Sequence, residues 1–453
     1  MTTNFFSLFR LANWSIILVS CLLYIGCKHT DPNPASDLSA DQLLLVQDLN
    51  KRISPIKDSD PTREFNELAS LDTLFKQVQV VGMGESTHGS REFFQMKDRL
   101  FRYLVQIHQH QTLGFEANFG RSVQINRFIH GQTTSLTSAS TAAKNLYFWP
   151  WATEEVSQLF QWMREYNASK GAAQQISFYG IDCQYADDEF PIIREFLAKV
   201  DPASVVKIDS VSNLFTLTIG ATSPTFFQQY AQKIPELYSL FVQNETKWAI
   251  AGGRQDYEVA KQAARILIQQ QDLVSGDACN YGIRRDKYMA ENVQWILTKM
   301  NVSKLSLWAH TGHVANLPGV NCNQPSMGTY LKQQLKNQYL IIGTSLTSGS
   351  FTVRNGALTE APITRLSIQG SVEPASYNYL LGKSQYPNYI LNLQQVNSST
   401  ASGNWFNTQH PFLLVGASYD ENKPNKSFYD IPLSTSLDVL IHFRDTTPTQ
   451  RLP

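Results

Sequence analysis

The chain has 453 residues, 42% of them hydrophobic, which is enough to bury a substantial core as one large domain or as a domain with a sizeable insertion. Lys and Arg together number 38, as do Asp and Glu, so the formal charge is zero. No overall field therefore favours nucleic acid or an anionic membrane surface, and we expect neither as a partner.

The N-terminus has the pattern of an export signal. Arg10 precedes an apolar run at residues 14–25, which is too short to span a bilayer as a mature anchor. The run ends at Gly26 and Cys27, and a small residue directly before a cysteine is similar to a bacterial lipoprotein processing site. We therefore expect a signal peptide at residues 1–26 and lipidation of Cys27. The protein would then sit in the cell envelope, periplasmic or on the outer membrane, and touch the membrane only through this lipid; a plain secretory signal is the alternative.

The cysteines do not indicate a disulfide framework. Cys183, Cys279 and Cys322 follow Cys27 in the mature chain, so these three can form one disulfide, and whether Cys279 pairs with Cys322 stays open. No C-x-x-C motif supports a structural zinc site of that type.

Residues 27–40 predict a tether, and residues 41–453 a single domain whose first helix covers residues 43–49. Apolar β-rich runs then alternate with helical stretches. The strands expected from these runs are residues 78–81, 112–115, 176–179, 305–308 and 340–342. Strands that alternate with helices predict an α/β fold with a largely parallel sheet flanked by helices on both faces.

The long interval between the third and fourth of these strands shows no convincing strand. Helical stretches at residues 226–242, 257–271 and 286–300 predict an insertion at about residues 185–300, packed over the sheet. Two later strands, at residues 412–415 and 439–443, are expected to complete an edge of the sheet.

Ionisable side chains follow the predicted strands where each strand ends. They are Glu85, His88, Glu116, Asp182, His310 and His313. Because the carboxyl ends of parallel strands share one edge, these groups are expected to converge in one cleft. An imidazole can take a proton from water while a carboxylate fixes its tautomer, so the pattern favours water activation with His88 as the base.

Simpler interpretations exist for single residues. His88 could cap the following helix, and Asp182 could be a helix N-cap. Glu116 could pair with Arg121 or Arg127. The convergence of several such strand ends outweighs these readings.

Two other chemistries would use the same turn. Residues 84–88, the turn after the first predicted strand, nearly match the G-x-S-x-G elbow with Ser86 as nucleophile, but His88 stands in place of the second glycine. Alternatively, His88, His310, His313 and Glu85 could bind zinc or manganese, although no H-E-x-x-H motif occurs. No cofactor is otherwise expected, and a divalent metal stays open.

Two further features could contribute to a cleft. Residues 146–151 are an aromatic cluster that mainly indicates core packing, although Trp151 would suit the wall of a cleft for a large apolar substrate. Arg285 opens a predicted helix that could place it at the cleft; alone it would read as part of a surface ion pair.

The order of these blocks resembles the erythromycin esterase family. The G-E-x-T-H-G turn and R-E of that family stand here at residues 84–92, and further blocks extend the similarity across about residues 40–445. These blocks are residues 114–117, 149–154, 179–182, 285–292 and 308–313. The resemblance implies an α/β fold and hydrolysis of a macrolide lactone by a water that a histidine activates, without a covalent intermediate.

The resemblance also implies residue roles. His88 would be the general base, with Glu85 and Glu116 orienting it or the water. The residues implied in substrate binding are His310, His313, Arg91, Arg285, Asp182 and Trp151, of which the two arginines would stabilise the developing oxyanion. Thr311 departs from the family, whose last block has an asparagine at this position.

We therefore expect a cell-envelope hydrolase that acts on a neutral, bulky ester or lactone as its small-molecule partner. A lipoprotein signal is unusual for an enzyme that acts on a cytoplasmic drug, so an antibiotic-resistance role is the narrower expectation. The alternative is a surface lipoprotein that binds haem or a metal ion without turnover.

Overall fold

The computed structural model describes residues 38–220, 224–275, 277–319, 324–356, 361–368, 373–396 and 399–453. The expected signal peptide, Cys27 and residues 28–37 of the expected tether lie outside this part. Ser39–Pro453 form one compact unit. None of the helices in the described ranges is long and apolar enough to cross a membrane.

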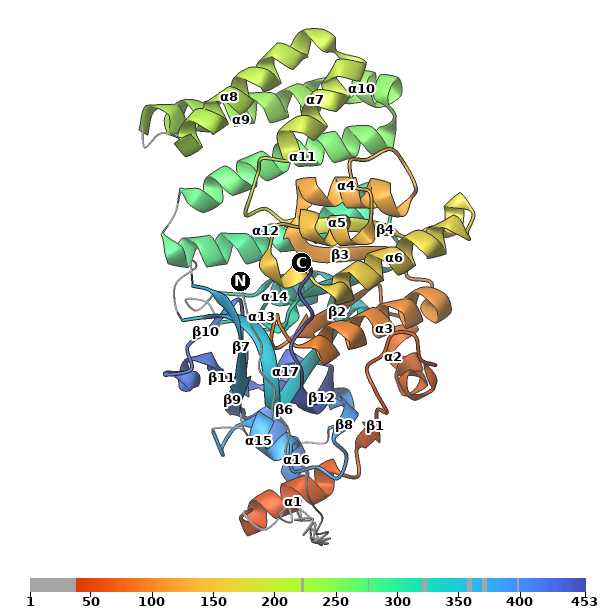
Figure 1. Ribbon diagram of the computed structural model, residues 1–453, viewed down its shortest axis with the longest axis vertical. Coiled ribbons are helices and arrows are strands. Elements are labelled where there is room, and N and C mark those ends of the chain that lie inside the picture. The colour runs from red at the N-terminus through yellow and green to blue at the C-terminus, as the bar shows by residue number, and fades with distance from the viewer. Residues whose placement is uncertain are drawn as a thin grey trace, which may run out of the picture. The chain divides into compact units, whose positions relative to one another are not determined.

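A mostly parallel sheet organises this unit (Figure 1). The strands are β1 (Ile53–Pro55), β2 (Val80–Glu85), β3 (Thr112–Asn118), β4 (Ser177–Asp182), β5 (Leu305–His310), β6 (Tyr339–Asn355), β7 (Ile363–Ile368), β8 (Asn388–Asn392), β9 (Gln409–Leu413), β10 (Ser418–Tyr419), β11 (Phe428–Pro432) and β12 (Val439–Thr446). The order is β1-β8-β12-β6-β2-β5-β3-β4, with β7 and β10 paired to β6. All neighbours from β12 to β4 run parallel, which confirms the expected sheet.

The helices either cover the two faces of this sheet or form a separate insertion. They are α1 (Ala40–Leu49), α2 (Asp72–Phe75), α3 (Arg91–His108), α4 (Phe119–Ile129), α5 (Ala139–Asn145), α6 (Glu154–Ala168), α7 (Glu189–Val200), α8 (Val205–Gly220), α9 (Pro224–Gln243), α10 (Glu245–Gly252), α11 (Arg254–Val274), α12 (Ala278–Lys299), α13 (Thr311–Val314), α14 (Met327–Leu335), α15 (Tyr377–Leu381), α16 (Ala401–Asn407) and α17 (Leu433–Ser436).

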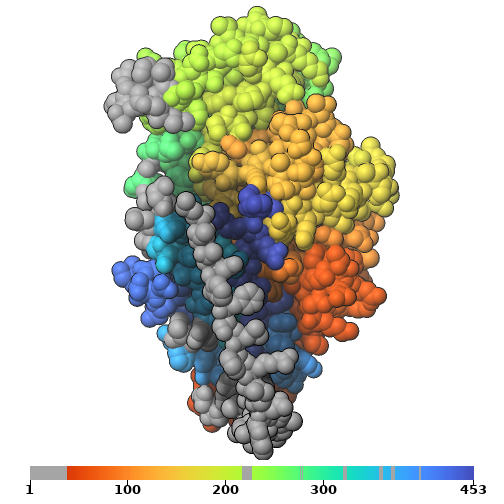
Figure 2. Space-filling view, viewed as in Figure 1, coloured from red at the N-terminus to blue at the C-terminus, as the bar shows by residue number. Residues whose placement is uncertain are grey.

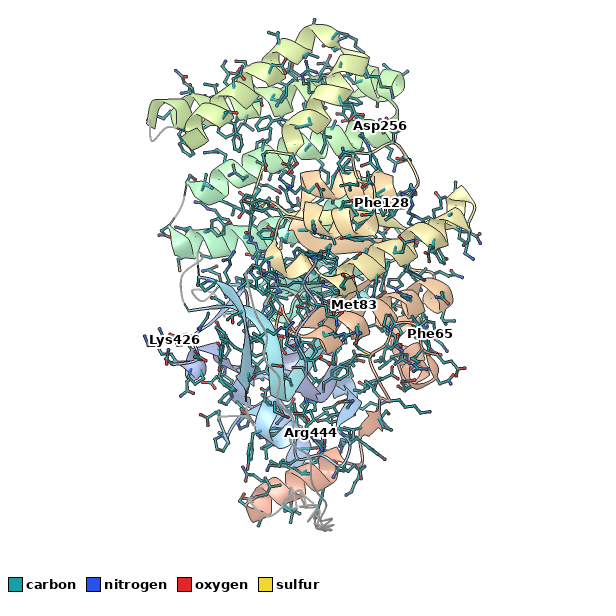
Figure 3. The ribbon with its side chains drawn as sticks, viewed as in Figure 1. Phe65, Met83, Phe128, Asp256, Lys426 and Arg444 are labelled. Atoms are coloured by element: carbon teal, nitrogen blue, oxygen red, sulfur yellow. The ribbon has the colours of Figure 1, made fainter. Side chains whose placement is uncertain are left out.

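Each face of the sheet packs into its own hydrophobic core. Along β2, Val81 and Met83 face one core with α3 and α6, whereas Val80 faces a second core with α12 and α14. Met83, labelled in Figure 3, lies in the middle of the fold. Because successive strand residues point to opposite faces and both faces are buried, the strands have the continuous apolar runs from which they were predicted.

The helical insertion expected between β4 and β5 is present. Helices α7–α11 pack around a third core of their own, which includes Phe196, Phe241, Trp248 and Tyr257. Figure 2 shows α7–α10 together at one end of the view. Helix α12 differs, because its Met289 belongs to the core beneath the sheet, so it is a sheet-covering helix.

The expected place of the last strands is wrong. β9 pairs with β11 in a separate two-stranded sheet, and β12 lies inside the main sheet between β6 and β8. Val439, Leu440 and Ile441 are all buried, so β12 is apolar on both faces and suits an interior position. The edges of the main path are instead β1 and β4.

The cysteines differ in state. Cys183 is buried and free. Cys279 is disulfide-bonded. Cys322 lies outside the described residues.

Candidate active site

The carboxyl ends of four neighbouring strands meet at one cavity. Glu85 and His310 end β2 and β5 and are register partners, Asn118 ends β3, and Asp182 ends β4. The cavity has a volume of about 610 Å³ and lies over these ends. The predicted residues that line it are His88, Glu116, Trp151, Arg285, His310 and His313.

A tight turn presents His88 to this cavity. Gly89 packs against β6 so closely that a Cβ atom would collide with the Thr352 carbonyl group, so only glycine fits there. Glu85, fully buried, accepts a hydrogen bond at Oε1 from His88 Nδ1 over 2.9 Å. With the proton held on Nδ1, the Nε2 lone pair of His88 is free to act as a base.

Lys97 completes this pair from α3, and the sequence interpretation missed it. Its Nζ contacts Glu85 Oε2, lies 3.3 Å from the Ala309 carbonyl oxygen and 4.3 Å from the centre of the Trp308 ring. The available signal was its position on the apolar stripe of α3, four residues after Phe93, where a charged side chain must be buried.

Burial and charge compete at this pair. Burial alone would raise the pKa of Glu85, but the Lys97 ammonium group and the His88 hydrogen bond outweigh it and lower that pKa below its ordinary value. Burial lowers the pKa of Lys97 to about 8. Glu85 is therefore a carboxylate at neutral pH and can only accept from His88.

His310 is the opposite tautomer of His88. Its Nδ1 accepts a hydrogen bond from the Gly312 backbone N–H over 3.1 Å, so a neutral ring carries its proton on Nε2. Burial, reinforced by the charge that His88 can carry, lowers the pKa of His310 to about 3 and keeps the ring neutral. Nε2 is buried without a partner among the described residues, and the ring centre lies 4.9 Å from that of His88.

Arg285 links the other predicted groups. Its guanidinium group donates to Asp182 over 2.7 Å and to Glu116 over 2.8 Å. Glu116 Oε2 accepts from the His310 backbone N–H over 2.7 Å, so Arg285 and β5 hold this carboxylate together. Arg121 and Arg127, the partners considered for Glu116 from the sequence, bind other carboxylates.

His313 is the cation beside Arg285. Its Nδ1 lies 2.8 Å from Asp286 Oδ1 and its Nε2 lies 3.3 Å from Glu116 Oε1 and 2.9 Å from Arg285 Nη1. Burial and the like charge of Arg285 would lower the pKa of His313, but Asp286 and Glu116 outweigh both and raise that pKa to about 10. Three carboxylates, with Asp182, therefore balance two adjacent cations.

The structure separates three other candidates from this cluster. Arg91 does not line the cavity, and its Nε lies 3.5 Å from Glu155 Oε1. Ser86 is fully buried behind the turn and outside the cavity lining, which does not fit a nucleophile. Thr311 Oγ1 is buried with no hydrogen-bond partner among the described residues and packs against Gly84.

A possible metal set differs from the expected one. Glu85, His88 and Glu116 bring ligand atoms within 4.8 Å of one another. Lys97 and Arg285 already neutralise the two carboxylates, which weakens their attraction for a divalent cation.

The C-terminal residues bind the turn that carries His88 and the segment that follows Trp151. The Thr449 N–H donates to the Gly89 carbonyl oxygen over 2.9 Å, and the Leu452 N–H donates to that of Ala152 over 3.0 Å. The dark blue atoms of this segment lie beside the yellow and orange segments in Figure 2.

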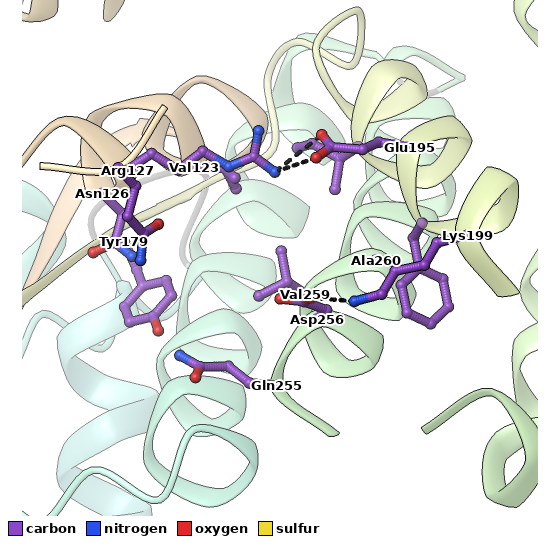
Figure 4. A pocket seen from close by; sticks show the side chains of 13 residues that line it. Val123, Asn126, Arg127, Tyr179, Glu195, Lys199, Gln255, Asp256, Val259 and Ala260 are labelled. Carbon is purple, nitrogen blue, oxygen red and sulfur yellow. Dashed lines mark hydrogen bonds and ion pairs between the residues drawn. The ribbon is translucent and has the colours of Figure 1, made fainter. Parts of the chain in front are cut away.

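A second cavity, of about 250 Å³, lies between α4, α7 and α11 (Figure 4). Its charged side chains pair with one another, Arg127 with Glu195 over 2.9 Å and Lys199 with Asp256 over 3.4 Å. No histidine lines it among the described residues, so it lacks the acid–base groups of the first cavity.

Two known proteins are similar to this chain in sequence. The putative hydrolase YbfO of Bacillus subtilis is 25% identical over 354 residues, which cover 72% of this chain and 77% of the relative. Erythromycin esterase type II of Escherichia coli is 26% identical over 323 residues, which cover 65% of this chain and 75% of that relative.

Two solved structures show the same fold. A Bacillus cereus protein superposes with a TM-score of 0.80 at 23% identity, covering 91% of this chain and 99% of that one. A mutant of the erythromycin esterase EreC in its open conformation gives a TM-score of 0.67 at 14% identity, covering 87% and 97%.

A family model settles the relationship. The model for erythromycin esterase matches residues 105–446, about three quarters of the chain, and begins after the turn that carries Glu85 and His88. The chain therefore belongs to the erythromycin esterase family, and this membership indicates a hydrolase.

Proposed function

We propose that this hydrolase cleaves carboxylic esters or lactones with a water molecule that His88 activates. The observation that carries the proposal is a pair of adjacent imidazole rings that are protonated on different nitrogens. His88 offers a lone pair at Nε2, because Glu85 holds the proton of Nδ1, and His310 offers an N–H at Nε2.

These two groups match the two needs of ester hydrolysis. A substrate carbonyl oxygen would accept a hydrogen bond from His310 Nε2, which then stabilises the negative charge that develops on that oxygen. His88 would take a proton from the attacking water and return it to the leaving alkoxide, which balances the proton without a covalent intermediate. Glu116 and Arg285 would act by fixing the backbone of His310 and the charge balance beside it.

The test is a panel of neutral esters and lactones, with erythromycin included because a relative bears that substrate in its name. Hydrolysis that survives a chelator and Ser86→Ala, but is lost in His88→Asn, supports the proposal. Full turnover by His88→Asn contradicts the mechanism.

A metal-dependent hydrolase is the second candidate, and the grouping of Glu85, His88 and Glu116 favours it. Those residues would hold a divalent ion, which would lower the pKa of a bound water. Loss of activity with a chelator and recovery with zinc or manganese would select this candidate. Stoichiometric haem or metal in a purified protein that turns over no ester would instead indicate a binding lipoprotein.

We also propose a lipid-anchored place in the cell envelope, supported by the cysteine that follows the apolar N-terminal run. Labelling with radioactive palmitate and membrane fractionation test it. Cys27→Ala should release the protein from the membrane fraction, and an unlabelled wild type would contradict lipidation.

A further inference from the structure

Two exposed aromatic side chains stand on the wall of the cavity that contains His88. Tyr147 is 62% exposed and Tyr185 is 39% exposed. Their ring centres lie 5.1 Å apart, and Phe148 approaches Tyr185 at 5.4 Å. We call these three side chains the aromatic clamp. Exposed apolar surface gathered at one cavity is typical of a ligand site.

The backbone at the clamp is strained. Tyr147 has φ of +70°, a left-handed conformation that an aromatic residue rarely adopts. Such a conformation persists where the surroundings impose it, and it is commonest at functional sites. Here the Tyr147 N–H donates to the Lys144 carbonyl oxygen over 3.2 Å, and the Phe148 N–H donates to that of Leu146 over 2.8 Å.

Arg121 of α4 joins the two segments of the clamp. It donates to the Asn145 carbonyl oxygen over 3.3 Å on one side and pairs with Asp188 over 2.6 Å on the other. Its guanidinium carbon lies 5.1 Å from the centre of the Tyr147 ring. The end of α5, before Tyr147, and the start of α7, after Tyr185, are thus tied to one side chain.

The clamp is also tied to the catalytic strands. Asn118, the last residue of β3, donates from Nδ2 to the Tyr185 carbonyl oxygen over 3.0 Å. Glu116 lies two residues earlier on the same strand. The strand that carries Glu116 therefore also holds the backbone of Tyr185.

We propose that the aromatic clamp binds an uncharged ring of the substrate, outside the bond that is cleaved. This inference rests on the proposed hydrolase function for its reacting end. Aromatic faces bind the C–H-rich faces of saturated rings and the faces of other aromatic rings. A cationic group fits less well, because Arg121 already lies over Tyr147 and because Arg285 and Arg354 line the same cavity.

The first experiment measures ring selectivity in the full-length protein. The ratio of kcat/KM for 1-naphthyl acetate to that for ethyl acetate is compared between wild type and Tyr147→Ala/Tyr185→Ala. We expect the ratio to fall about 4- to 140-fold, since each of the two rings contributes about 2- to 12-fold to such contacts. Tyr429→Ala is the matched control, because Tyr429 is also 39% exposed but lies on β11, and its ratio should not change.

The second experiment separates binding from turnover. Fluorescence titration with the non-hydrolysable N-(1-naphthyl)acetamide is repeated in wild type, His88→Asn and the double tyrosine variant. Binding retained in His88→Asn and weakened in the double variant supports the clamp, even if no ester is turned over. Ester turnover with unchanged ring selectivity and unchanged naphthyl binding in the double variant would overturn the clamp and leave the hydrolase proposal standing.

Discussion

The two cavities compared above both place carboxylates beside basic side chains, yet they differ in how deeply those charges are buried. In the cavity of Figure 4, Lys199 and Asp256 are 55% and 66% exposed at the side chain, so water screens the pair. At the strand ends, Lys97 and Glu85 are 3% and 0% exposed. This difference shows that an ion pair shifts the pKa values of its neighbours strongly only when burial removes the screening by water.

The strongest test of this contrast is His88→Asn. It removes the lone pair that faces the cavity and should lower kcat/KM for esters by about 10³-fold, within the usual range for a general base. The melting temperature should change little, because the side chain lines a cavity. Steady-state kinetics with circular dichroism as a folding control measures both; a loss below 10-fold would contradict the assigned role.

Arg285→Met tests whether the strand-end charges depend on one another. Glu116 and Asp182 would lose their shared partner inside the protein, so the free energy of unfolding should fall by about 3–5 kcal/mol. Urea denaturation measures this loss. A change below 1 kcal/mol would place Arg285 on a level with the exposed pairs of the second cavity.

His313→Asn tests the pH dependence of stability. The pKa of His313 is about 10 in the folded protein against an ordinary 6.5, so its contribution is complete below pH 6.5 and is lost as the pH rises towards 10. The wild type should therefore lose stability over that window by an amount on the order of a few kcal/mol, and the variant should lose less.

A second histidine supplies the control for sign. His310 has a pKa of about 3, so it destabilises the fold as the pH falls below 6.5. His310→Asn should therefore lose less stability than the wild type at acid pH. Urea denaturation at pH 5, 7 and 9 separates the two variants. Equal slopes for His313→Asn and wild type above pH 7 would contradict the charge assigned to His313.

Lys97→Met tests the pair that orients His88. Without the ammonium group, burial raises the pKa of Glu85, and a protonated Glu85 no longer requires the proton on His88 Nδ1. We expect activity about 10- to 100-fold lower at neutral pH and recovery as the pH rises, so that the acidic limb of the pH–rate profile moves upward.

Arg99→Met is the matched variant on the same helix. Arg99 is equally buried and pairs with Glu67, away from the cavity. It should lose stability without a shift in the pH–rate profile. A uniform loss at every pH in Lys97→Met would reduce Lys97 to a structural role.

The smallest effect is expected in the second cavity. Lys199→Met removes a solvent-screened partner of Asp256 and should change the free energy of unfolding by less than about 1 kcal/mol. Ester hydrolysis should stay at the wild-type level. A loss of activity would break the contrast between the two cavities and point to a role for the helical insertion.

The sequence predicted those parts that short-range patterns specify. The apolar runs at residues 78–81 and 305–308 indicated β2 and β5, whose residues are buried on both faces. β2 nevertheless starts at Val80 and continues to Glu85, through residues that the sequence did not predict as strand. β1 and β10 are too short for such a signal. The placing of β12 depended on which strands pair, and no pattern within residues 439–446 states its neighbour.

The site divides in the same way. Glu85 and His88 stand three residues apart, so one turn already brings them together. The partner of Glu116 is Arg285, 169 residues away, and two nearer arginines were equally plausible from the sequence. Tyr185 gave no signal either, since its role as a cavity wall arises from contact with the segment of Tyr147.

The sequence by itself determined the alternation of strands and helices, the strand-end positions of the ionisable residues and the family resemblance. These follow from hydrophobic periodicity and from motifs within one turn, which are local properties of the chain. The tertiary structure alone decided which charges are buried together, as Lys97 with Glu85 and Arg285 with Glu116. That choice depends on the order of strands and the packing of α3 and α12, and it fixes the proton positions because burial makes each unpaired charge costly.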